Sequence, residues 1–167
     1  MKRVKVGLDQ WVIAGNTSTT ELLTDGLSGC VALVLESQNS FCLAHVFSGC
    51  NQSNWESYKK ELELPLVILK KHMPLRAALC YSDDNKTKLV ELLETWLKSV
   101  GISVIDTYKT SGVRVSYHSG MHGVEIFKKE EDNQDYYIKK SNYISVSNAA
   151  PYIENWGELS KIAEDVE

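Results

Sequence analysis

The residues most suited to chemistry lie in the first third of the chain, around a cysteine that follows a glycine-rich turn. Cys30 closes the segment Thr24-Asp25-Gly26-Leu27-Ser28-Gly29-Cys30, and an apolar run begins directly after it. A thiol is a useful nucleophile only when a neighbour takes its proton or stabilises the thiolate. Gly26 and Gly29 permit backbone angles that other residues avoid, and they keep bulky side chains away from the sulfur. The segment predicts a nucleophilic thiol at a strand start, whose backbone N–H could stabilise an oxyanion.

A base for this thiol is available 15 residues further along the chain, at His45. The runs from Cys30 to Leu35 and from Phe41 to Phe47 are apolar and are separated by polar turn residues, which is typical of a β-hairpin. Paired positions in a hairpin sum to a constant, so Cys30 is expected opposite positions 46 to 48. His45 should therefore lie close to Cys30 in the folded protein.

A third group is needed to hold the imidazole in the right tautomer. Thr24 could accept the ring N–H through its hydroxyl or its carbonyl, which would complete a Cys-His-Thr triad. Another carbonyl or polar side chain could do the same. A buried cysteine is more commonly a small hydrophobic residue, and a histidine on an apolar strand is more commonly structural. The residue types alone leave both interpretations open.

Several stretches resemble those of known glutamine deamidases. Leu27-Ser28-Gly29-Cys30 resembles the LSGC motif of the cytotoxic necrotizing factor and Burkholderia lethal factor toxins, and the step to His45 resembles the necrotizing-factor arrangement. Other stretches resemble the chemoreceptor glutamine deamidase CheD. Val6 to Val12 resembles its opening strand, and Thr24 to Cys30 resembles its TxGLGSC motif. Leu43 to Val46 resembles its LAHxxLP motif, and Thr110 to Val115 resembles its late GGxxGRxV segment.

The resemblance implies a protein-glutamine deamidase with Cys30, His45 and Thr24 as catalytic residues, and with Ser28 and Gly29 beside the bound substrate. The thiolate would attack the glutamine carboxamide, ammonia would leave, and water would hydrolyse the thioester to give glutamate. An amine in place of water would give transglutamination. The implied chemistry requires no metal and no organic cofactor.

Departures from the chemoreceptor family bear on the substrate. Ser28-Gly29 replaces its Gly-Ser, the proline of LAHxxLP is missing after Val46, and Thr110-Ser111 replaces a glycine pair. These differences favour a bacterial effector or toxin that acts on a protein of the host cytosol. The alternatives are a chemoreceptor deamidase of the producing cell, a catalytically silent binding module on the same scaffold, and a thiol hydrolase acting on peptide bonds.

Other candidate residues are weaker. Ser48-Gly49-Cys50 echoes the segment before Cys30 but has no histidine at matching spacing. Cys42 and Cys80 stand among apolar neighbours and are expected in the core. His118 lies at a predicted hairpin tip, where it could line the rim of a substrate cleft, although such turns collect solvated polar residues.

Composition limits the class of protein. The chain has 167 residues, 43% hydrophobic and 24% charged residues and a net charge of −4. This predicts a single domain over residues 1–167, without a nucleic-acid-binding or membrane-spanning surface. The resemblance implies that this one domain is catalytic and acts on a protein substrate, and we expect it to be a monomer. The four cysteines lack metal-site spacing and are expected to be reduced in a cytosol. No Sec signal peptide is recognisable, so entry into a host would need another route.

The periodicity predicts an α+β fold: a single-domain α/β sandwich of mostly antiparallel strands with flanking helices. The resemblance to CheD implies that this sandwich is CheD-like. Capping-box spacing at Ser53 predicts a helix that Pro65 kinks or splits. Leu89 to Val100 recur at helical spacing after a cap at Asp83 or Asp84. A short amphipathic helix is expected from about Glu154. Strands are expected at Val4 to Ile13, Arg76 to Tyr81, Ile102 to Tyr108, Val113 to Tyr117, Gly123 to Phe127 and Tyr136 to Val146, in addition to the hairpin around residue 38.

Overall fold

The computed structural model describes most of the first 127 residues and shorter pieces beyond them. The described residues are 2–15, 20–38, 40–72, 75–82, 88–118, 121–127, 136–137, 153 and 155–159. They form two α-helices, one short 3-10 helix and eleven strands.

The strands form two sheets, with six antiparallel and three parallel neighbour pairs among them. The first sheet has the order β10-β1-β3-β8-β9 and the second β11-β2-β5-β4-β6-β7. The strands are β1 (Lys2–Lys5), β2 (Gln10–Gly15), β3 (Thr20–Asp25), β4 (Val31–Glu36), β5 (Ser40–Val46), β6 (Arg76–Tyr81), β7 (Ile105–Lys109), β8 (Gly112–His118), β9 (Met121–Phe127), β10 (Tyr136–Tyr137) and β11 (Asn155–Glu158), and the helices are α1 (Trp55–Leu69), η1 (Lys70–His72) and α2 (Lys88–Ser99).

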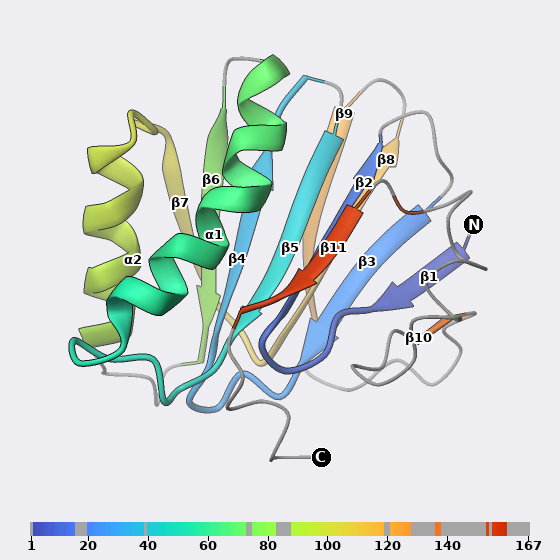
Figure 1. The fold of residues 1–167 in the computed structure, drawn as a ribbon. Coiled ribbons are helices and arrows are strands. Elements are labelled where there is room, and N and C mark those ends of the chain that lie inside the picture. Colours follow the sequence, from blue (N-terminus) through green and yellow to red (C-terminus); the bar gives the residue numbers. More distant parts are fainter. Residues whose placement is uncertain are drawn as a thin grey trace.

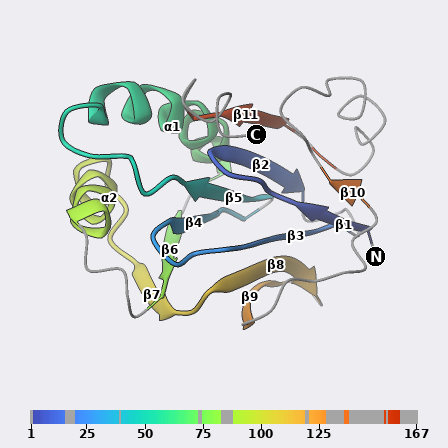
Figure 2. The ribbon, with the colours of Figure 1, turned by 90° about the horizontal axis from the view of Figure 1, so that it is seen from below.

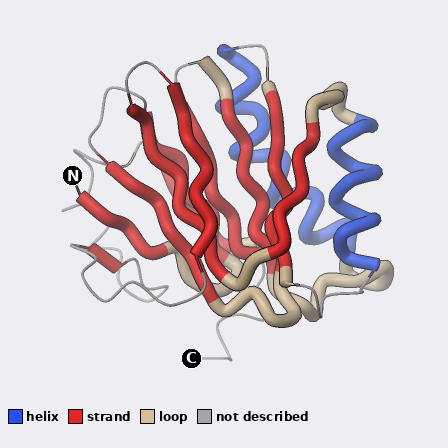
Figure 3. The backbone as a smooth tube through the Cα atoms, turned by 180° about the vertical axis from the view of Figure 1, so that it is seen from behind, coloured by secondary structure: helices blue, strands red, loops and turns tan. Residues whose placement is uncertain are grey.

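The elements stack in three layers, with α1 and α2 covering one face of the second sheet and the first sheet packed against its other face (Figures 1 and 2). From behind, the strands lie in front of both helices (Figure 3). Two separate apolar cores fill the spaces between the layers. Strands β4 and β5 are buried at every described position because both faces of their sheet are covered. The predicted α+β sandwich of mostly antiparallel strands with flanking helices is confirmed.

Most predicted elements are present. The hairpin of β4 and β5 pairs Val31 with Val46 and Ala32 with His45, so paired positions sum to 77 as the hairpin argument requires. The predicted strand from Arg76 to Tyr81 matches β6, and the later hairpin matches β8 and β9. Of the strand expected from Tyr136, the described part is β10; its remainder, and the caps at Asp83 and Asp84, fall outside the described residues.

Two expectations need correction, and one strand was not predicted. The single strand expected at Val4 to Ile13 is two strands, β1 and β2, which belong to different sheets. The chain crosses between the sheets at residues 6–9, where Asp9 has a φ of 56°. The helix expected from Glu154 is instead the edge strand β11, paired antiparallel with β2. Strand β3 was not expected, because its first residues follow a polar stretch.

Helix α1 begins as expected but without the predicted capping box. Its N-cap is Asn54, which makes no side-chain capping hydrogen bond. Pro65 lies inside the helix, which continues to Leu69 and is not split. The ribbon of α1 changes direction along its length (Figure 1), as expected where a proline removes one backbone hydrogen bond.

Candidate active site

Cys30 and His45 lie on the same face of the β4–β5 hairpin. Ala32 is directly opposite His45, and Cys30 is two residues before Ala32. Side chains two apart on a strand share a face, so the thiol and the imidazole occupy diagonal positions. That face belongs to the core between the two sheets, in which Cys30 is only 8% exposed. The hairpin register thus brings the predicted nucleophile and base together.

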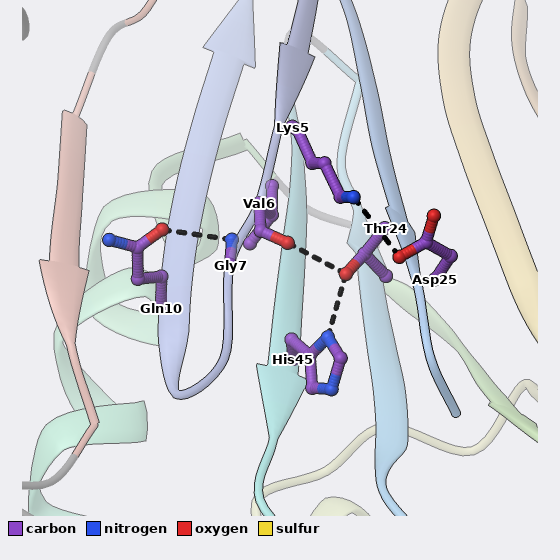
Figure 4. Close-up of polar contacts among 7 residues, drawn as sticks. All are labelled: Lys5, Val6, Gly7, Gln10, Thr24, Asp25 and His45. Carbon is purple, nitrogen blue, oxygen red and sulfur yellow. Dashed lines mark hydrogen bonds and ion pairs between the residues drawn. The ribbon is translucent and has the colours of Figure 1, made fainter. Parts of the chain in front are cut away.

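Thr24 reaches His45 from the opposite sheet. The Thr24 Oγ1 lies 2.7 Å from the His45 Nδ1 and 2.7 Å from the Val6 carbonyl oxygen (Figure 4). The hydroxyl has one proton, and the carbonyl can only accept, so the hydroxyl donates to Val6 and accepts from Nδ1. The ring is therefore protonated on Nδ1, and its Nε2 carries a lone pair. Nε2 is buried and has no hydrogen-bond partner among the described residues.

Burial keeps His45 neutral. Loss of solvation, with a smaller contribution from the positive charge of Lys5, lowers the pKa of His45 from 6.5 to about 4. The imidazole is consequently uncharged at neutral pH and can accept a proton at Nε2. Lys5 is itself paired with Asp25, at 3.3 Å between Nζ and Oδ1 (Figure 4).

The Cys30 thiol is also neutral at rest. Burial raises its pKa above 9.0, and the negative charge of Asp9 raises it further, whereas hydrogen bonds from the Ser48 backbone and side chain lower it. A preformed thiolate–imidazolium pair is therefore disfavoured. Space at Gly29 is tight, because a Cβ at this position would lie 3.2 Å from the Ser48 Cβ and would push Ser48 away by a few tenths of an ångström.

The three residues share one open pocket of about 260 Å³. Its lining comes from both sheets and from the crossing between β1 and β2: Lys5, Val6, Gly7, Leu8, Thr24, Asp25, Gly26, Cys30 and His45. A larger hollow of about 430 Å³ lies between α1 and α2 and is lined by Trp55 and Trp96, among others. That hollow contains neither a cysteine nor a histidine, so the smaller pocket is the better candidate for the reaction.

The other predicted residues are placed less closely. Ser28 is exposed, and its carbonyl accepts a hydrogen bond of 3.3 Å from the Ser82 hydroxyl. His118 is five residues beyond Val113, the strand partner of Thr24, so its backbone lies roughly 16 Å along β8 from the triad. Its side chain is outside the described part of the structure. The predicted roles of Ser28, Gly29 and His118 in substrate binding stay predictions.

The remaining cysteines are free and buried. Cys50 belongs to the other core, beneath the helices, and burial with the nearby Asp9 charge raises its pKa to about 12. Cys80 is fully buried and its pKa is likewise raised to about 12. Neither lines the pocket of His45.

Sequence reasoning missed the residues that support the triad. The Val6 carbonyl, Ser48 and Asp9 all act through contacts that the fold creates between distant segments. The only local signal is at Asp9, since aspartate is one of few residues other than glycine that tolerate a positive φ.

Within the described ranges, no group of three or more His, Cys, Asp or Glu residues is arranged to hold a metal ion. No described helix is long and apolar enough to cross a membrane. A comparison of the chain with known protein families finds no match, and a comparison with curated protein sequences finds none either.

Proposed function

We propose that this protein is a cysteine-dependent protein-glutamine deamidase. The observation that carries the proposal is the fixed tautomer of His45, whose Nδ1 is held by Thr24 while Nε2 carries a lone pair in the pocket of Cys30. An oriented, neutral imidazole beside a neutral thiol is the arrangement that general-base activation of a nucleophile requires.

The reaction follows from these groups. His45 Nε2 takes the proton from the Cys30 sulfur as the sulfur attacks the carboxamide carbon. The proton then passes from Nε2 to the amide nitrogen, the C–N bond breaks, and ammonia leaves. Water, activated by the same nitrogen, attacks the thioester, releases glutamate and returns the proton to the thiol. An amine in place of water would give a transglutaminated product.

The burial of the reacting groups favours a side-chain amide over a peptide bond. Cys30 is 8% exposed and His45 6% exposed, so both lie at the base of the pocket. A glutamine carboxamide is carried at the end of an unbranched side chain and can reach a thiol that is almost fully buried, whereas a peptide bond is flanked by chain on both sides. This supports a macromolecular substrate that presents one glutamine side chain.

The biological setting rests on the sequence resemblance. The Ser28-Gly29 order and the missing proline favour an effector that deamidates a protein of a host cytosol. A chemoreceptor deamidase of the producing cell uses the same chemistry and differs only in its substrate. A silent binding module would need neither a reactive thiol nor an oriented histidine.

The deciding experiment compares wild type, Cys30→Ser and Cys50→Ser in host-cell lysate and in lysate of a bacterium that carries chemoreceptors. Peptide mass spectrometry would search for glutamine-to-glutamate conversion. Cys50→Ser is the matched control, because it removes a buried thiol outside the pocket. We expect conversion with wild type and Cys50→Ser and none with Cys30→Ser. Identical peptides from all three proteins would refute the proposal.

A further inference from the structure

Asp9 is a buried carboxylate at the crossing between the two sheets. It is 0% exposed and has a φ of 56°, in the left-handed region that non-glycine residues seldom adopt. Its Oδ1 accepts from the Phe47 N–H at 2.9 Å, and its Oδ2 accepts from the Tyr58 hydroxyl at 2.7 Å. Its own backbone N–H donates to the His45 carbonyl at 2.8 Å, and its carbonyl accepts from the Leu159 N–H at 2.7 Å.

These contacts extend the ladder between β2 and β5 beyond its last regular pair, which is Trp11 with Ala44. The carboxylate takes the hydrogen bond of the Phe47 N–H, a backbone group, while the Asp9 N–H holds the carbonyl of His45. Asp9 therefore hydrogen-bonds the chain on both sides of Val46, at His45 and at Phe47. The residue after Phe47 is Ser48, which hydrogen-bonds the Cys30 sulfur.

The charge of Asp9 acts on the thiol as well. The charged and titratable groups around Cys30 include Asp9 from the crossing, His45 from β5, Lys5 from β1 and Asp25 from β3, and the uncharged thiol of Cys80 from β6 belongs to the same core. His45 is neutral, and Lys5 and Asp25 pair with each other. Among these groups Asp9 is the one whose charge raises the pKa of Cys30.

We propose that Asp9 is a positioning residue of this site: its hydrogen bonds on both sides of Val46 hold the end of β5, and the Ser48 that follows it, beside Cys30. Its negative charge adds to the larger effect of burial in disfavouring the thiolate of Cys30. The effect on turnover rests on the proposed deamidase function. The effect on the thiol does not, because the reactivity of Cys30 can be measured without a substrate.

The test is the pH profile of iodoacetamide alkylation, followed at the Cys30 peptide by mass spectrometry. Asp9→Asn keeps an oxygen for the Phe47 N–H and tolerates the positive φ, but it removes the charge. Loss of a nearby negative charge stabilises the thiolate, so the midpoint should fall. Asp9→Gly suits the same φ and should give a shift in the same direction, which covers the case in which Asp9→Asn does not fold.

Two controls separate charge from structure. Glu36→Gln removes a buried negative charge at the far end of β4, outside the pocket of Cys30, and should leave the Cys30 midpoint unchanged. Tyr58→Phe removes one hydrogen bond to the Asp9 carboxylate but keeps the charge, so it should lower thermal stability and leave the midpoint in place. An unshifted midpoint in the Asp9 variants, or an equal shift in Glu36→Gln, would overturn the inference.

The outcomes also separate this inference from the proposed function. If the midpoint shifts but no glutamine substrate is found in either lysate, Asp9 still controls the thiol and only the deamidase proposal fails. If wild type deamidates a protein and the midpoint does not shift, only the role of Asp9 fails.

Discussion

Replacing Thr24 with valine is the sharpest perturbation of the candidate triad. Valine has nearly the shape of threonine, so packing between the sheets is preserved while the hydroxyl is lost. Two buried hydrogen bonds of 2.7 Å disappear together, one from His45 Nδ1 and one to the Val6 carbonyl. The change therefore isolates the orientation of the imidazole from the shape of the site.

The size of the effect follows from these two contacts. Each buried polar group left without a partner costs about 1–3 kcal/mol, so the loss of both contacts should lower the free energy of unfolding by about 2–6 kcal/mol. Nδ1 would no longer be the preferred site of the ring proton. If the less well oriented imidazole raises the activation free energy by about 1.4–2.8 kcal/mol, the reaction becomes roughly 10- to 100-fold slower. Thr24→Ser keeps the hydroxyl oxygen, so its reaction rate should stay within about threefold of the wild-type rate.

Three measurements check the prediction for Thr24. The rate of iodoacetamide alkylation at Cys30 reports proton removal, and ammonia release from a glutamine substrate reports turnover. The ¹⁵N shifts of His45 report the tautomer directly: Nδ1 should be protonated in wild type and Thr24→Ser, and not uniformly so in Thr24→Val. Wild-type rates and an unchanged tautomer in Thr24→Val would show that another group orients the histidine.

The remaining predictions concern protonation and space. Between pH 6.5 and about 4, His45 binds fewer protons in the folded protein than in the unfolded chain, so the free energy of unfolding falls as pH falls through this window, by about 3 kcal/mol in total. Urea unfolding at several pH values should show this fall, and a His45→Gln variant should lose this pH dependence. Lys5→Gln should raise the pKa of His45 only partway towards 6.5, because burial is the larger cause, and an NMR titration that finds no rise would contradict the role of Lys5. Gly26→Ala should cost about 1–2 kcal/mol through its φ of 71° without slowing alkylation of Cys30, because nothing lies within 4 Å of the added Cβ. Gly29→Ala should slow alkylation by displacing Ser48, and equal rates in the two alanine variants would refute the assignment.

The part of the site that was predictable is the part built by one hairpin. Pairing of β4 with β5 follows from two apolar runs around a short turn, and the constant sum of paired positions then brings Cys30 and His45 together. This is local information, carried by about twenty consecutive residues. The helices were predictable for the same reason, since the apolar face of α2 repeats at helical spacing along one segment.

The errors fall where distant segments decide the local structure. One strand was expected at Val4 to Ile13 because the apolar residues alternate loosely throughout, yet Asp9 turns the chain from one sheet to the other. The segment at Asn155 pairs with the free edge of β2, and this pairing overrides a short helical pattern. Propensity over four residues is too weak to resist such a contact.

Thr24 belongs to the same class of problem. The sequence motif indicates Thr24 as a candidate, but its contact with His45 depends on how the two sheets pack. Thr24 lies on β3 in one sheet and His45 on β5 in the other. The Val6 carbonyl, in the crossing between the sheets, accepts the hydroxyl proton and so decides which way the hydroxyl points. A threonine without that carbonyl could donate its proton to Nδ1 and would then leave the ring protonated on Nε2, the wrong nitrogen for a base. The tautomer of His45 is therefore set by a backbone oxygen 39 residues earlier in the chain, through the hydroxyl of Thr24 on β3.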